Sequence, residues 1–203
     1  MSDTATKKLL TEYLPIHINR ADLNEAVKGN GTFSIRAILQ RANSENQNGR
    51  IYPKPVLERE AAKYAKEFVS NRRSLGELDH PSERTVVNLA NVSHIISEMH
   101  WEGNDLVGNI EILSTPMGNI VKELLRNGVQ LGVSSRGVGS VTQMREGTDR
   151  VEDDYNLVCF DIVSNPSTQG AFLGEGVSHS LQENKHARLN GLIIDFFSEL
   201  GKK

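Results

Sequence analysis

The stretch TVVNLANVSHIISEMHWEGNDLVGNIEIL, residues 85–113, contains two runs of mainly apolar and β-branched side chains around a short polar turn. Gly103 and Asn104 lie between the runs, and both residue types favour tight turns. The stretch therefore predicts a long β-hairpin. Such a hairpin indicates an antiparallel sheet, because its two strands run in opposite directions.

Further strands and helices are predicted on either side of this hairpin. Residues 32–41 alternate apolar and polar side chains, which is typical of a half-buried strand. Strands are also expected at residues 129–142 and 155–163. Apolar residues recur at helical spacing over residues 56–70, and residues 118–128 predict a second, short helix that ends at a glycine. The sequence thus predicts an α+β fold, mainly antiparallel, with flanking helices.

Composition divides the chain into three parts. Residues 1–30 are mixed and rich in turn formers, which indicates an N-terminal extension. Residues 31–167 contain the predicted strands and helices and form the domain. Residues 168–203 begin with small and polar side chains without a clear period, which predicts a flexible linker, and end in an amphipathic helix. The apolar side of that helix consists of Leu189, Leu192, Ile193, Phe196 and Leu200.

The overall composition favours a soluble, intracellular protein. A formal net charge of −3 provides no broad basic face for a phosphate backbone, so no nucleic-acid partner is expected. The longest apolar runs are well short of the roughly 20 residues that span a bilayer, so no membrane association is expected. Cys159 is the only cysteine, which excludes an internal disulfide bond and a cysteine-rich metal site.

Three residues in separate motifs have the chemistry of a serine hydrolase. His80 lies in GELDHP, Ser134 in GVSSRG and Asp161 in VCFDIV. A serine hydroxyl is a poor nucleophile unless a base takes its proton, and the base acts best when a third group fixes its tautomer. The residues alone leave open, and even favour, an ordinary interpretation in which the histidine stabilises a turn, the serine ends a strand and the aspartate is solvated.

Strand alternation predicts which of these side chains share a face. Ser134 and Arg136 point to one side of their strand, and Asp161 and Cys159 point to one side of theirs. Both pairs are expected to leave the core side of neighbouring strands. The core side is predicted to hold Leu131, Val133, Ser135, Val158, Phe160 and Ile162.

Other reactive groups fit ordinary structural roles. His94 and His100 are six residues apart on one predicted strand and should share a face, but no third ligand accompanies them at a zinc-site spacing. Two surface histidines, and no metal site, are therefore expected. Cys159 is a conceivable thiolate nucleophile, but a lone cysteine between two apolar residues is expected to be a small core residue.

From Asn48 to Ser167 the chain contains, in order, NGRIYPKPVLE, a predicted helix, GELDHP, EMHWEGNDLVGNIEIL, GVSSRGVGS and FDIVSNPS. This ordered set resembles the prohead core protein proteases of large tailed phages, which are serine proteases similar in fold to the herpesvirus assemblins. The resemblance implies an assemblin-like domain with a β-barrel-like antiparallel core. It implies no cofactor.

The resemblance also implies roles for individual residues. His80 matches the general base of the family and Ser134 matches the nucleophile. The third member of the triad is expected to be Asp161, with Glu77 and Asp79 as alternatives near His80 in sequence.

The tetrahedral oxyanion needs preorganised donors, and backbone N–H groups near Arg136 and Gly137 are the candidates. The Arg136 side chain is expected either to hold that loop or to receive an acidic side chain of the substrate.

Members of this family cut after glutamate in short segments that have an aliphatic residue two positions earlier. This chain contains LTE ending at Glu12, LGE ending at Glu175 and LQE ending at Glu183. Self-cleavage is expected at these sites, above all after Glu175 and Glu183 in the linker, where it releases the terminal helix. LGE ending at Glu77 also matches, but folding should protect it.

The implied function is that of a serine endopeptidase in capsid maturation. Its expected substrates are the scaffold or core proteins and the major capsid protein, inside the assembling prohead in the host-cell cytoplasm. By the resemblance to assemblins, a homodimer or a higher oligomer is expected. The alternative is a non-catalytic capsid-assembly protein that keeps the protease fold.

Overall fold

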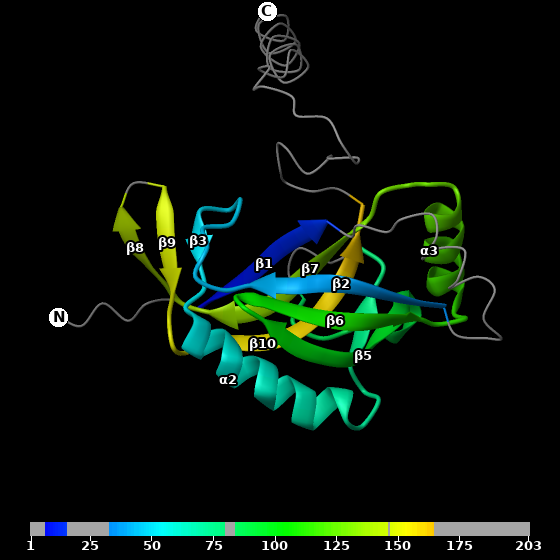
Figure 1. Ribbon diagram of the computed structural model, residues 1–203, viewed down its shortest axis with the longest axis horizontal. Coiled ribbons are helices and arrows are strands. Elements are labelled where there is room, and N and C mark those ends of the chain that lie inside the picture. Colours follow the sequence, from blue (N-terminus) through cyan, green and yellow to red (C-terminus); the bar gives the residue numbers. More distant parts are fainter. Residues whose placement is uncertain (1–6, 16–32, 80–83, 146, 165–203) are drawn as a thin grey trace, which may run out of the picture. The chain divides into compact units, whose positions relative to one another are not determined.

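The computed structural model describes residues 7–15, 33–79, 84–145 and 147–164. More of them lie in strands than in helices, and the helices lie beside the strands (Figure 1). The strands are β1 (Lys8–Pro15), β2 (Phe33–Arg41), β3 (Arg50–Ile51), β4 (Leu75–Glu77), β5 (Val92–Glu102), β6 (Asp105–Ile112), β7 (Gly132–Gly139), β8 (Val141–Arg145), β9 (Thr148–Val151) and β10 (Asn156–Val163). The helical segments are α2 (Lys54–Tyr64), which continues as a π-helical turn η1 (Ala65–Val69), the 3-10 turn η2 (Leu89–Asn91) and α3 (Pro116–Arg126).

The strands of the described part of the chain form three sheets. Their strand orders are β1–β7–β10, β2–β6–β5–β4 and β3–β9–β8. The paired strands are antiparallel except for β3 and β9. The predicted hairpin is confirmed as β5 and β6, which end at the pair Glu102–Asp105 around the turn at Gly103. The α+β class is therefore confirmed, and within the described ranges the sheets do not close into one barrel.

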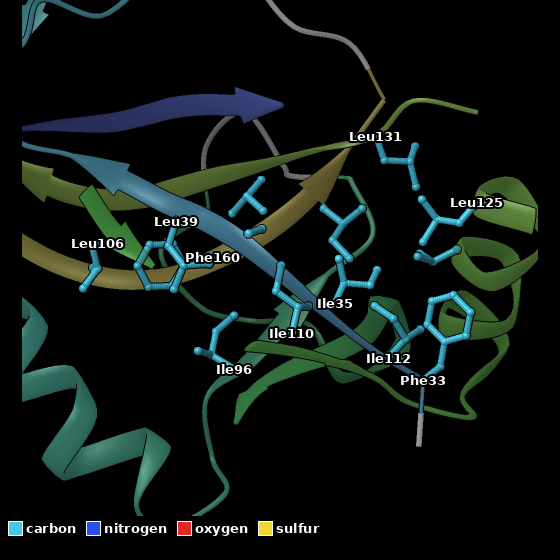
Figure 2. Packing of buried hydrophobic residues seen from close by; sticks show 14 of the residues in the cluster. Phe33, Ile35, Leu39, Ile96, Leu106, Ile110, Ile112, Leu125, Leu131 and Phe160 are labelled. Atoms are coloured by element: carbon cyan, nitrogen blue, oxygen red, sulfur yellow. The ribbon is translucent and has the colours of Figure 1, made fainter. Parts of the chain in front are cut away.

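The main core lies between the sheet that contains β7 and β10 and the sheet that contains β2, β5 and β6. Figure 2 shows Ile35 of β2 beside Ile110 of β6, and Leu39 of β2 beside Phe160 of β10 in the same cluster. The ring of Tyr64 in α2 contacts Phe160 edge-on, and Leu125 of α3 belongs to the same cluster. Burial of this cluster holds the two sheets and both helices together.

The alternation predicted for β2 is confirmed up to Ile38. Phe33, Ile35 and Ala37 are buried, as expected. A bulge between Ile38 and Gln40 then adds a residue to the strand and reverses the pattern. As a result the polar side chain of Gln40 is buried.

β1 lies in the segment predicted as an N-terminal extension, yet it pairs along its whole length with β7. Its Leu10 is buried in a second apolar cluster that also contains Tyr52. Glu12 is buried too, and its Oε1 accepts the Tyr52 hydroxyl at 2.8 Å and pairs with Arg50 at 2.8 Å. These contacts place β1 within the folded domain.

The rest of the predicted N-terminal extension lies outside the described residues, and so do the predicted linker and terminal helix at 168–203. In the described ranges, no helix has an apolar stretch long enough to cross a bilayer.

Candidate active site

Ser134 is the third residue of β7, which is the central strand of its sheet. It pairs with Tyr13 of β1 on one side and with Asp161 of β10 on the other. Directly paired residues of antiparallel strands project to the same face, so Ser134 and Asp161 are side by side on one face of the sheet. The predicted grouping of these two residues is thus what the structure shows.

Ser135 projects to the opposite face. Its Oγ accepts a hydrogen bond of 3.0 Å from Nε2 of Gln40, across the core. The two adjacent serines therefore have different surroundings, as the strand alternation predicted. Ser134 faces the polar cluster around Asp161, whereas Ser135 faces β2.

The motif GELDHP contacts β10 on the side away from β7, close to Asp161. The backbone N–H of Glu77 donates to Oδ1 of Asp161 at 3.0 Å, and the N–H of Asp79 donates to the carbonyl of Ile162 at 2.7 Å. Because neighbouring strands are about 4.8 Å apart, Asp79 lies about 10 Å from β7. His80, which follows Asp79, lies outside the described residues. Two motifs more than fifty residues apart in sequence thus converge on Asp161 and Ile162.

The backbone at Asp79 turns sharply after this contact. Its φ of 62° lies in the left-handed region, which aspartate tolerates better than most residues. The backbone at Asp79 is therefore no longer that of an extended strand.

Asp161 is fully buried, so the interpretation as a solvated aspartate is wrong. Its Oδ1 accepts the Glu77 N–H and also Nη2 of Arg136 at 3.2 Å. Its Oδ2 lies 3.0 Å from Nε of Arg136, but no described donor reaches this oxygen with hydrogen-bond geometry. Burial raises the pKa of Asp161, since loss of water outweighs the opposing effects of the Glu77 N–H and Arg136. One oxygen of this carboxylate can therefore accept a further donor.

Glu77 is also fully buried, but both of its oxygens are already used. Oε1 accepts the N–H of Asn88 at 3.0 Å and Nη2 of Arg136 at 3.0 Å. Oε2 accepts Nη2 of Arg84 at 3.1 Å and Nδ2 of Asn91 at 3.2 Å. Burial alone raises the pKa of Glu77, yet the Asn88 N–H together with Arg136 and Asn91 lowers it overall. Glu77 is thus an ionised carboxylate with four donors.

The Arg136 side chain is completely buried in this cluster. Besides its contacts to Glu77 and Asp161, its Nη1 donates to the carbonyl of Arg84 at 2.8 Å. Burial opposes the charged form, but Cys159, Asp161 and Glu77 together raise the pKa of Arg136. A guanidinium held in this way is not presented to an acidic side chain of a substrate.

Gly137 allows close packing on the other face of β7. A Cβ atom at this position would lie 2.4 Å from the ring of Tyr155. Arg136 and Gly137 both belong to a strand that is paired on each side, with β1 and with β10. Backbone N–H groups in such a strand serve the sheet ladder, so the structure does not place either one as a free oxyanion donor.

Local sequence patterns do not predict Arg84, Asn88 and Asn91 as partners of the buried Glu77. These three residues lie in the stretch predicted as part of the hairpin. Their partner, Glu77, lies in the motif GELDHP, which precedes that stretch. Only the three-dimensional path from β4 to η2 brings them together.

His94 differs from its prediction. It was expected on the surface and on the same face as His100, but a bulge between Ile96 and Glu98 reverses the alternation within β5. His94 is completely buried, with Nε2 at 3.0 Å from the Phe160 carbonyl and Nδ1 at 2.9 Å from Oγ of Ser93. Since a carbonyl only accepts, Nε2 carries the proton and Nδ1 accepts the Ser93 hydroxyl.

The buried His94 predicts a loss of stability in mild acid. Burial lowers the pKa of His94 from 6.5 to about 4, although the Phe160 carbonyl opposes this. Between these values the unfolded chain binds a proton that the folded chain does not, so stability is full above pH 6.5 and falls as the pH falls. We expect a loss of about 2 kcal/mol between pH 7 and pH 5, measured by urea unfolding. His94→Gln should show a smaller loss over this range, and an equal loss would contradict the assignment.

Cys159 is a buried residue on the same face as Asp161. Its Sγ lies 3.5 Å from Oδ1 of Asp161. Burial and, after it, the charge of Asp161 raise the pKa of the Cys159 thiol far above neutrality, despite Arg136 nearby. The thiol therefore stays protonated, which does not suit a thiolate nucleophile.

Comparison with known proteins shows the family of this chain. The family model described as prohead core protein serine protease matches residues 7–182. The chain belongs to this family. The prohead core protein protease of Enterobacteria phage T4 is 37% identical over 142 residues, which cover 68% of this chain and 66% of that protein, just under two thirds of its length. The solved structure of the bacteriophage T4 capsid assembly protease, gp21, has a TM-score of 0.70 at 32% identity and covers 79% of this chain and 99% of that chain.

The candidate self-cleavage sites differ in their structural surroundings. Glu12 is in the middle of β1 and is 3% exposed, and Glu77 is fully buried in β4. A protease needs several residues of extended, accessible chain, so both sites are protected while the domain is folded. Glu175 and Glu183 lie outside the described residues.

Proposed function

We propose that this chain is a serine endopeptidase that cleaves scaffold and capsid precursor proteins after glutamate during prohead maturation and that also processes itself. The observation that carries the proposal is the pairing of Ser134 with Asp161 on neighbouring strands, beside the segment that leads into His80. Family membership supports the same function. The relatives from phage T4 are named as a prohead core protein protease and a capsid assembly protease.

In the proposed mechanism, Oγ of Ser134 attacks the peptide carbonyl carbon while His80 takes its proton. The C–N bond then breaks, and His80 gives the proton to the leaving amine. Water, activated by the same histidine, hydrolyses the acyl-enzyme and restores Ser134. No cofactor takes part in these steps.

We assign the third position of the triad to Asp161. Its Oδ2 has no described hydrogen-bond donor, although it is buried, and so it can accept an imidazole N–H and fix the tautomer of His80. Glu77 is less suited, since four donors already occupy its oxygens. Asp79 stays the alternative because it precedes His80. Asp161→Asn should reduce kcat far more than Asp79→Asn if the assignment is right.

The proposed substrates are the scaffold or core proteins and the major capsid protein, cut inside the prohead in the host cytoplasm. A homodimer or a higher oligomer is the proposed active form. Self-cleavage is proposed after Glu175 and Glu183. Cleavage after Glu12 requires that β1 first leave its place beside β7, which makes it the slowest of the three sites.

A serine-directed fluorophosphonate tests this function directly. We expect a covalent adduct on Ser134, mapped by peptide mass spectrometry. We also expect cleavage of a Leu-x-Glu peptide at least about 100-fold faster than of its Leu-x-Gln counterpart, because a site that binds a carboxylate leaves its own charged or polar groups poorly paired when the substrate carries a neutral amide. Iodoacetamide should have no effect, since Cys159 is buried and protonated. Inhibition by iodoacetamide without phosphonate labelling would instead indicate a cysteine hydrolase. No labelling and no cleavage would favour the non-catalytic capsid protein.

A further inference from the structure

A pocket of about 440 Å³ lies between α2 and the start of β10, and we call it the α2–β10 pocket. Much of its wall is apolar or aromatic and consists of Tyr64, Phe68, Leu75, Val87, Leu157 and Val158. Val86 and Leu89 also line it, although these large apolar side chains are 72% and 73% exposed. An apolar pocket of this size beside exposed apolar side chains is typical of a binding site.

The α2–β10 pocket lies close to the paired Ser134 and Asp161. Val158, which lines the pocket, precedes Asp161 by three residues on β10, and three residues of extended strand span about 10 Å. Tyr64 on the α2 side is close as well, because burial and then the charges of Cys159 and Asp161 raise its pKa. The pocket is therefore within about three residues of extended chain from the proposed nucleophile.

Polar groups of the pocket suit a bound peptide segment. The Tyr64 hydroxyl is buried and has no described hydrogen-bond partner, which is costly unless a bound chain supplies one. Lys63 and Arg73 line the pocket, and neither forms an ion pair within the described ranges, whereas Glu60 is already ion paired. These two cations outnumber Glu67, the other acidic lining residue, so the charge of the pocket favours a segment that carries a glutamate.

The candidate cleavage segments have a matching pattern in their sequences. The residue three positions before the glutamate is Leu9 in LLTE, Phe172 in FLGE and Ser180 in SLQE. Two of these three segments thus have a large apolar side chain at this position. The residue three positions after the glutamate is neither a large aliphatic nor an aromatic residue in any of them. An apolar side chain at the right distance is therefore found on the N-terminal side of the glutamate.

We propose that the α2–β10 pocket is a specificity site, which binds a large apolar side chain of the protein substrate three residues before the glutamate that is cut. This inference rests on the proposed function and adds a fourth position to the Leu-x-Glu segment. When the glutamate carbonyl lies at Ser134, an extended substrate spans about 10 Å over these three residues, as β10 does between Asp161 and Val158.

Peptides that differ only at this position test the proposal. The peptide AFLGEGVS copies residues 171–178, and ASLGEGVS has serine in place of Phe172. Wild-type protein should cleave AFLGEGVS with a kcat/KM at least about 10-fold higher, because the aromatic side chain leaves water for an apolar site. The peptide ASLGEGVF, with the aromatic residue three positions after the glutamate, should lose this advantage. Equal rates for all three peptides would overturn the proposal.

Variants of the protein show whether the preference arises in the α2–β10 pocket. The double variant Val86→Ser and Leu89→Ser removes two exposed side chains of the lining, so the fold should be kept. The ratio of the rates for AFLGEGVS and ASLGEGVS should then fall below about threefold, because the two changes act on one contact. Val129→Ser is the matched control, since this valine is 41% exposed and lies outside the pocket lining. A wild-type ratio in the double variant would contradict the assignment.

Binding to Ser134→Ala protein provides a readout that needs no cleavage. In methyl NMR spectra, addition of AFLGEGVS should shift the resonances of Val86 and Leu89 and leave those of Val129 in place, and ASLGEGVS should bind at least about fivefold more weakly. Binding without shifts at Val86 and Leu89 would overturn the proposal. A wild-type protein that neither cleaves nor reacts with phosphonate would instead contradict the proposed function, and the methyl shifts would still decide what the α2–β10 pocket binds.

Discussion

Replacing Ser134 with alanine is expected to stop all cleavage after glutamate and to leave the fold intact. The substitution removes one oxygen from the residue paired with Asp161, and no other side chain nearby can take its place, since the Cys159 thiol is held protonated. Loss of a triad nucleophile typically lowers kcat by a factor of about 10⁴ to 10⁶. Intact mass spectrometry after incubation at neutral pH measures this. Wild type should lose the chain beyond Glu175 or Glu183, and Ser134→Ala should keep its full mass.

Ser135→Ala is the matched control for this result. The two serines are adjacent, yet Ser135 faces the core and accepts a hydrogen bond from Gln40. Its removal leaves the buried Gln40 amide without this acceptor and should cost about 1–3 kcal/mol of stability while self-cleavage continues. Equal trimming of wild type and Ser134→Ala would remove Ser134 from the mechanism. Trimming of neither would indicate that a partner or a dimer activates the enzyme, or that the chain is a structural protein.

Local patterns were sufficient to predict the features that repeat within one strand or one hairpin. The two-residue period of a strand placed Ser134 and Arg136 on one face of β7, and the turn at Gly103 predicted the β5–β6 hairpin. Both depend on residues that are close in sequence. The same period placed Asp161 on the matching side of its own strand.

The errors in strand alternation came from bulges, which local patterns do not reveal. Each of β2, β5 and β10 contains one, and each reverses the alternation beyond it. The bulge in β5 buries His94, and the bulge in β10 lies at Val158, which was predicted to share the core face of Phe160. A bulge depends on the partner strand, so its position follows from the whole sheet.

The charged cluster could not be predicted for a related reason. Glu77, Arg136 and Asp161 belong to three different strands. Each of these charged residues, taken alone, is expected on the surface. They are buried because β4 crosses beside β10 and brings the three together. Resemblance to a family predicted roles for these motifs, but only the arrangement in space shows which side chains contact one another.

Gly76→Ala is expected to lose at least about 3 kcal/mol of stability, measured by urea unfolding, because there is no room for the added carbon. A Cβ atom on Gly76 would lie 2.1 Å from the Phe160 carbonyl oxygen and 2.3 Å from Nε2 of His94. Backbone on one side and a fully buried ring on the other cannot both move aside. The same contact allows Nε2 of His94 to donate to Phe160, so the substitution also breaks this buried hydrogen bond.

Gly103→Ala is the control, since the same carbon is added where nothing lies within 4 Å. Its φ of 59° favours glycine, so it should lose only about 1–2 kcal/mol. A larger loss in Gly76→Ala measures how tightly β4 is held against β10. The distance between β4 and β10 also determines whether the Glu77 N–H reaches Asp161, since Glu77 follows Gly76 directly. If the two variants lose equal stability, β4 is not held against β10 at this point in solution.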